Sequence, residues 1–150
     1  MRSTMFRAGL TAVAALTAGL LAAAVPASAE TVQYKAMIMP ASEVPPVTNS
    51  KGMGQLAATY DSDTMMLSYT VTFDGLTGPA IMTHFHGPAP VGKNAGVMVP
   101  VSGETASPVK GSVKLTADQA KALTSGEMYF NIHTPANKGG EMRGQVEKAM

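Results

Sequence analysis

The chain has 150 residues, with 11 Lys and Arg against 10 Asp and Glu, and its formal net charge of +1 excludes a strongly basic nucleic-acid-binding surface. It contains no cysteine, which excludes disulfide bonds, thiol catalysis and thiolate metal sites. Any metal site must therefore use histidine, methionine or oxygen ligands.

The first 29 residues have the three parts of a secretory signal peptide. Arg2 and Arg7 supply positive charge, residues 8–25 are apolar and uncharged, and Pro26 precedes the small-residue sequence Ala-Ser-Ala at 27–29. We predict cleavage after this sequence. The alternative is a retained membrane anchor, but the apolar run is short and is diluted by alanine and glycine.

Cleavage would leave residues 30–150, a length typical of one domain. This segment keeps nine of the eleven basic residues and all ten acidic residues, so its net charge is near −1. It has no second hydrophobic stretch long enough to span a bilayer. We therefore expect a secreted or periplasmic protein with no membrane contact after signal cleavage and no nucleic-acid partner.

Turn-forming residues interrupt this segment about every ten positions, which is typical of an all-β sandwich or barrel. The clearest strand is 65–73, where Leu67, Tyr69 and Val71 fall on one face. We expect about eight strands. In chain order they are residues 31–39, 54–60, 65–73, 80–86, 96–101, 109–115, 127–133 and 141–146.

One short helix is expected after the sixth strand. Thr116 and Gln119 have the spacing of a capping box, in which a hydroxyl and a side chain three residues later satisfy the first amides of a helix. Gly126 is a suitable stop for this helix. A single helix among so many strands favours an antiparallel Greek-key β-sandwich over βαβ units.

The three histidines of the chain all lie near the ends of two expected strands. His84 and His86 are two residues apart, so both imidazoles project from one face and Phe85 projects toward the core. His133 ends a later strand, on the face opposite Phe130. If the two strands are neighbours, the three imidazoles would form a site for one transition-metal ion, and copper or zinc is the expected ion.

Two further interpretations of these residues are open from the sequence. Met82 lies on the face of His84 and would add a thioether ligand. Alternatively, the histidines have a structural role and hold loops by hydrogen bonds, because nothing in their spacing distinguishes this role from metal binding.

Methionine is unusually frequent, with ten Met against five Leu in residues 30–150. Thioether ligation of copper(I) is one explanation, but only Met37 and Met39 have a suitable spacing, and they lie in an apolar segment. We expect that the methionines as a set fill the core.

The segment 139–145 (GGEMRGQ) places Glu141, Arg143 and Gln145 on one face of the last expected strand. These side chains would form either a polar ligand-binding stripe or a structural group. We favour the structural role, in which a partly buried Arg143 pairs with a carboxylate or with loop carbonyls and holds the long loops in place.

Four segments together resemble the CHRD (chordin-type) domain. They are residues 41–47 (ASEVPPV), 83–88 (THFHGP), 126–134 (GEMYFNIHT) and 140–145 (GEMRGQ), in the order of that family, within residues 32–147. The resemblance implies export and a β-sandwich but little chemistry. The family pattern includes histidines at the positions of His84, His86 and His133.

The His-x-His strand also resembles copper–zinc superoxide dismutase, which is a Greek-key sandwich. That enzyme needs more than three histidines and an aspartate for zinc, so we do not expect dismutase activity. We also find no nucleophile elbow, phosphate-binding loop or paired carboxylates.

The leading hypothesis is an exported, non-catalytic CHRD-domain binding protein with a copper or zinc site at His84, His86 and His133. The second is a structural module that contacts an envelope or extracellular protein through its Gly- and Pro-rich loops. A metal-dependent enzyme is the weaker third alternative, and it would need a deep pocket beside the histidines.

Overall fold

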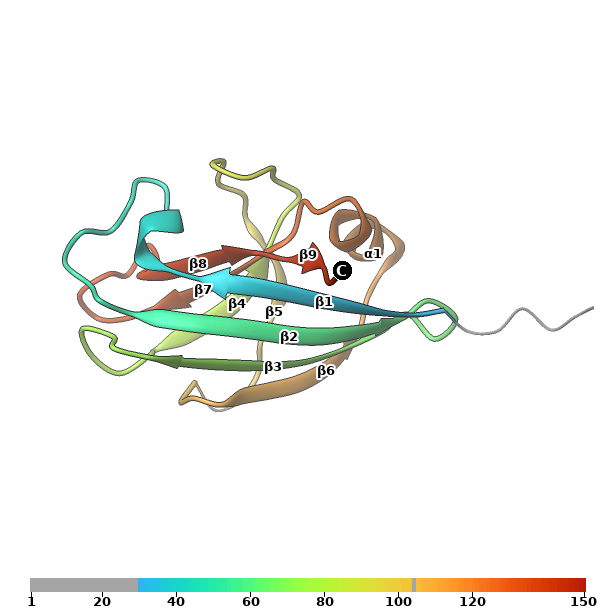
Figure 1. Ribbon diagram of the computed structural model, residues 1–150, viewed down its shortest axis with the longest axis horizontal. Helices are drawn as coiled ribbons and strands as arrows, with labels where there is room; N and C mark the ends of the chain where they lie inside the picture. Colours follow the sequence, from blue (N-terminus) through green and yellow to red (C-terminus); the bar gives the residue numbers. More distant parts are fainter. Residues whose placement is uncertain (1–29, 104) are drawn as a thin grey trace, which may run out of the picture.

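Two antiparallel sheets packed face to face form the computed structural model, which describes residues 30–103 and 105–150 (Figure 1). The predicted signal peptide, residues 1–29, lies outside the described residues. One sheet has the strand order β6-β3-β2-β1-β9 and the other has the order β5-β4-β7-β8. The elements in chain order are β1 (Thr31–Ile38), η1 (Pro40–Ser42), β2 (Met53–Asp61), β3 (Met66–Asp74), β4 (Met82–His86), β5 (Val97–Pro100), β6 (Val109–Lys114), α1 (Ala117–Thr124), β7 (Tyr129–His133), β8 (Met142–Gln145) and β9 (Glu147–Lys148).

This architecture confirms the prediction of an all-β antiparallel sandwich with one short α-helix. The chain passes repeatedly between the sheets: β6 leaves the sheet of β5 to pair with β3, and β7 returns to pair with β4. Within the described ranges no helix has the length and apolar character needed to span a membrane.

The core lies between the inner faces of the two sheets. Leu67 and Val71 of β3 are fully buried, as the alternation in that strand predicts. Phe85 of β4 is also fully buried and packs edge-on against Phe130 of β7, with 4.9 Å between ring centroids. Burial of each such side chain contributes about 1.5–3 kcal/mol, and the domain depends on these contacts because it has no disulfide.

The predicted capping box is present at the start of α1. The Gln119 amide donates to the Thr116 hydroxyl, and the Thr116 amide donates to Gln119 Oε1 at 2.8 Å. Leu123 turns into the core, and Gly126 follows the C-cap with φ +73°. The helix connects β6 of one sheet to β7 of the other and lies at one end of the sandwich (Figure 1).

The last predicted strand, 141–146, corresponds to β8, and a short strand that was not predicted, β9, follows it and makes nine strands among the described residues. Residues 142–145 pair with β7, whereas Glu147 and Lys148 pair with β1 of the other sheet. Between them the Val146 amide donates to the Met128 carbonyl at 2.9 Å. The chain therefore changes sheets at Val146.

The expectation that the methionines fill the core is wrong for several of them. Met128 and Met142 are fully buried. Five others are exposed, because they lie on outer sheet faces, at strand ends or after the last strand: Met37, Met39, Met53, Met82 and Met150.

Candidate metal centre

The outer face of the four-stranded sheet carries polar side chains in cross-strand rows. The alternation that directs Phe85 and Phe130 into the core directs the intervening side chains of β4 and β7 to this opposite face. The rows, read across β4, β7 and β8, are Met82–His133, His84–Asn131–Arg143 and His86–Tyr129–Gln145. All five residues of β7 are buried, because loops cover this outer face as the other sheet covers the inner one.

The three histidines that the sequence analysis selected meet on this face. His84 Nδ1 and His133 Nε2 are 3.4 Å apart. One ligand nitrogen from each of His84, His86 and His133 lies within 4.8 Å of the other two. Two nitrogens bound to one ion at about 2.0–2.1 Å in tetrahedral geometry are separated by roughly 3.3 Å, so small side-chain rotations would complete the set.

Backbone carbonyls orient two of the three rings. His86 Nδ1 lies 3.1 Å from the carbonyl of Ala95, and His133 Nδ1 lies 2.9 Å from the carbonyl of Lys138. Because a carbonyl only accepts, each Nδ1 carries the proton and each Nε2 keeps its lone pair, which in His133 faces His84 Nδ1. The buried Nε2 of His86 has no hydrogen-bond partner among the described residues. This arrangement is the usual outer-sphere support of a metal-binding histidine.

The environment favours the neutral forms of His84 and His86. Burial lowers the pKa of His84, and the neighbouring His133 lowers it further. Burial likewise lowers the pKa of His86; the hydrogen bond to Ala95 opposes this effect, and the nearby His84, His133 and Arg143 add to it. Metal binding requires deprotonated imidazoles, so the site needs no proton release from these two rings at neutral pH.

Tyr129 links the histidines to a buried cation. Its ring stacks on His86, with 5.0 Å between centroids and 7° between planes. The Arg143 guanidinium carbon lies 3.6 Å from the centre of the same ring. Because β7 lies between β4 and β8, the tyrosine separates the imidazole from the guanidinium.

Arg143 is 2 % exposed and has the structural role that the sequence favoured, although its partner differs from the expected one. It donates from Nη1 to Asn94 Oδ1 at 3.1 Å, and thus holds the 87–96 loop through a side-chain amide. Asn94 in turn donates from Nδ2 to the Val44 carbonyl at 2.9 Å. The arginine therefore joins β8 to two loops.

A buried carboxyl lies next to the histidines. Glu43, which follows η1, accepts a hydrogen bond from Asn131 Nδ2. Burial raises the pKa of Glu43 to about 7, although Arg143 and Asn131 oppose the shift. Glu43 and Asn131 line a cavity of about 230 Å³ that also touches His86, so the site has room for water or a small ligand.

Glu141 anchors the loops on the other side of the site. Its carboxylate accepts hydrogen bonds from Ser50, Thr77, Thr134 and Asn137. Burial alone would raise its pKa, but the hydrogen bonds lower it to about 2. The ionised carboxylate of Glu141 therefore holds these loops in place.

Met82 occupies the position opposite His133 in the pairing of β4 with β7. Its side chain is 43 % exposed, so it has room to turn toward an ion held by the three rings. A thioether is a soft ligand that favours copper(I) over zinc.

The sequence analysis did not single out Glu43, Asn94 or Asn131. Glu43 lies in the segment ASEVPPV, which entered only as a family landmark, and an isolated glutamate before a Pro-Pro pair carries no signal of burial. The two asparagines act through loop contacts between distant segments. Only tertiary structure reveals such contacts.

Fold and site together define a small antiparallel β-sandwich with a three-histidine cluster on the outer face of one sheet. The family model of the CHRD domain matches residues 34–146, which is most of the chain. The protein therefore belongs to the CHRD domain family, as the four sequence segments indicated. No curated protein and no solved structure gives a significant match.

Proposed function

We propose that this protein is an exported, non-catalytic binding protein of the CHRD family that holds one copper or zinc ion through His84, His86 and His133. The observation that carries the proposal is the convergence of three ligand nitrogens within 4.8 Å. Three imidazoles suit either ion and leave an open position for water or for the Met82 thioether. The match to the CHRD domain supports a binding module.

The hydrogen bonds around the three histidines are of the type that orients the ligands of metal sites. Two rings have their tautomers set by the Ala95 and Lys138 carbonyls. A buried imidazole nitrogen without a partner, as at His86, is costly unless something occupies it. A bound ion would satisfy this nitrogen.

The test is a titration of the purified protein with copper(II) and with zinc(II), followed by calorimetry and thermal unfolding. We expect one ion per chain, and a free-metal concentration 100 times Kd should raise the free energy of unfolding by about 2.7 kcal/mol. A chelator should reverse the increase. The variant in which all three histidines are replaced by alanine should show neither effect.

A matched control uses a carboxylate on the other sheet. Asp63 is exposed in the turn between β2 and β3, so Asp63→Ala tests adventitious binding to surface acids. It should leave the stoichiometry and affinity unchanged. Equal metal affinity in the triple histidine variant and the wild type would refute the metal site.

The second candidate function is a structural or protein-interaction module in the envelope or outside the cell. The hydrogen bonds of His86 and His133 to loop carbonyls favour it, because they show both rings holding loops. Capture of a partner from envelope extracts that is unaffected by chelator, and is lost when the 87–96 loop is replaced, would support this function. Dependence of capture on metal would support the leading proposal.

A further inference from the structure

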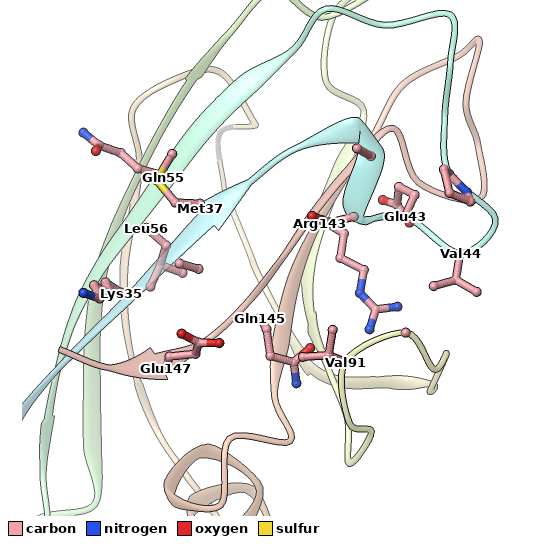
Figure 2. A pocket seen from close by; sticks show the side chains of 15 residues that line it. Lys35, Met37, Glu43, Val44, Gln55, Leu56, Val91, Arg143, Gln145 and Glu147 are labelled. Atoms are coloured by element: carbon pink, nitrogen blue, oxygen red, sulfur yellow. The ribbon is translucent and has the colours of Figure 1, made fainter. Parts of the chain in front are cut away.

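A further cavity lies beside the histidine cluster and is separate from it. Its volume is about 690 Å³, within the range of small-molecule sites. Most of its wall is apolar, with Met37, Val44, Leu56 and Val91 among the lining side chains. Figure 2 shows these side chains coming from β1, β2 and two loops around a common space.

The cavity contains a buried cation that forms no ion pair among the described residues, although the Glu43 carboxyl is near enough to interact with it. Arg143 lines the wall, and its guanidinium lies between Val44 on one side and Val91 and Gln145 on the other (Figure 2). Its Nη1 donates to the neutral amide of Asn94, and its Nη2 has no hydrogen-bond partner within the described part of the chain. A buried, half-satisfied guanidinium is costly, and a carboxylate is the group that its geometry fits best.

A second polar atom in the same wall is also without a partner. Gln145 donates from Nε2 to the carbonyls of Ala89 and Gly126, which leaves its Oε1 unpaired among residues 30–103 and 105–150. A ligand hydroxyl or amide N–H would satisfy this oxygen. Two orphaned groups of opposite hydrogen-bonding character therefore lie at one end of an apolar pocket.

We propose that this cavity binds a small carboxylic acid with an apolar tail, whose carboxylate accepts from Arg143 and whose tail packs along Met37 and Leu56. Glu43 also lines the cavity, and its carboxyl becomes neutral below pH about 7, so it does not repel the ligand in mildly acid solution. The proposal does not depend on metal binding, because none of the three histidines lines this cavity.

The Asn94 side chain holds Arg143 to a loop, although Asn94 itself lines the smaller cavity beside His86 and not this one. It joins Val44, in the loop after η1, to Arg143 through two hydrogen bonds. A ligand carboxylate would therefore accept from the unpaired Nη2 or compete with Asn94 for Nη1. Asn94→Ala removes this competitor, so it should leave carboxylate binding intact or strengthen it.

The test uses 4-phenylbutyrate as the probe for binding to the purified chain at pH 6, observed by ¹H–¹⁵N NMR and calorimetry. We expect saturable binding with a Kd of about 1 mM or tighter and a shift of the Arg143 Nε–Hε signal, identified by its loss in Arg143→Lys. Two control ligands separate the contributions of the carboxylate and of the apolar tail to the affinity. The alcohol 4-phenylbutanol lacks the charge and acetate lacks the tail, and each should bind at least about tenfold more weakly.

Protein variants locate the site. Val91→Trp adds bulk to an exposed lip of the cavity and should weaken phenylbutyrate binding about tenfold or more without unfolding the domain. Val97→Trp is the matched control, because Val97 is also exposed but lies on β5 outside the cavity. Absence of saturable binding, equal affinity for the acid and the alcohol, or equal loss in the two tryptophan variants would overturn the proposal.

Discussion

His84 and His133 are 49 positions apart in the chain, yet their Nδ1 and Nε2 atoms are separated by 3.4 Å. The contact is diagonal across the pairing of β4 with β7, in which His84 faces Asn131 and His133 faces Met82. Both rings lie on the outer face of the sheet, where loops exclude solvent from β7. The metal proposal depends on this one diagonal contact and on His86, which extends the cluster along β4.

Removal of a single imidazole should affect metal binding far more than stability. His84→Ala, on a half-buried ring with no backbone hydrogen bond of the kind that His86 and His133 make, should lower copper or zinc affinity roughly 100-fold or more, because one of three ligands is lost. The free energy of unfolding of this variant without metal should differ from that of the wild type by less than about 1 kcal/mol. Calorimetric titration and denaturant unfolding measure the two effects. A large loss of stability with unchanged metal affinity would show that the ring is structural.

Replacement of Met82 should separate the two candidate ions. Met82→Leu removes the thioether while keeping size and hydrophobicity, so copper(I) affinity should fall about tenfold and zinc(II) affinity should stay within about twofold. Competition with chelators of known affinity measures both values. Met53 is also an exposed methionine and lies on the other sheet, so Met53→Leu is the control and should change neither affinity. An equal change in the affinities for both ions would show that the Met82 thioether is not a ligand.

Acid should destabilise the domain through Glu141. Its pKa is about 2 in the folded state and near 4.5 in the unfolded chain, so its ionised form stabilises the fold above pH 4.5. This contribution, about 3 kcal/mol at most, is lost as pH falls from 4.5 toward 2. Urea unfolding at several pH values should show this loss in the wild type and a smaller one in Glu141→Gln. The exposed control Glu147→Gln should follow the wild type.

The pair Gly139 and Gly140 gives a matched test of the packing beside the histidines. A Cβ on Gly140 would lie 2.5 Å from Asn131 Nδ2 and 2.6 Å from Glu43 Oε1, and the backbone there has φ +132°. Gly140→Ala should therefore cost about 3 kcal/mol through strain and overpacking. A Cβ on Gly139 would meet nothing within 4 Å, so Gly139→Ala should cost less than about 1 kcal/mol. Similar stabilities of the two variants would contradict the packing around Glu43.

Much of the fold follows from local patterns in the sequence. The alternation in β3, the capping box at Thr116 and the turn at Asp61, whose side chain accepts from two following amides, each depend on residues close together in the chain. The short strand β9 after Val146 was not predicted, because its pairing depends on which sheet edges are free. The exposure of Met37 and Met53 was missed for a related reason: an apolar residue carries no mark of which sheet face it occupies.

The sequence predicted the candidate site about as well as it predicted the fold. Period-two alternation placed His84 and His86 on one face, and the structure adds the contact with His133. The loops that bury Glu43 and Arg143 could not be predicted, because their positions follow from hydrogen bonds such as Asn94 to Val44 between segments 50 residues apart. The loops bury this polar face of the sheet, and burial shifts the pKa values of His84, His86 and Glu43.

Counting the imidazole ligands of a bound ion tests the central proposal most directly. X-ray absorption spectroscopy of the protein loaded with one equivalent of zinc or copper should show three imidazole nitrogens at about 2.0–2.1 Å. The count should fall to two in His84→Ala. One imidazole or none in the wild type, or a count that does not respond to this variant, would contradict a metal centre built on His84, His86 and His133.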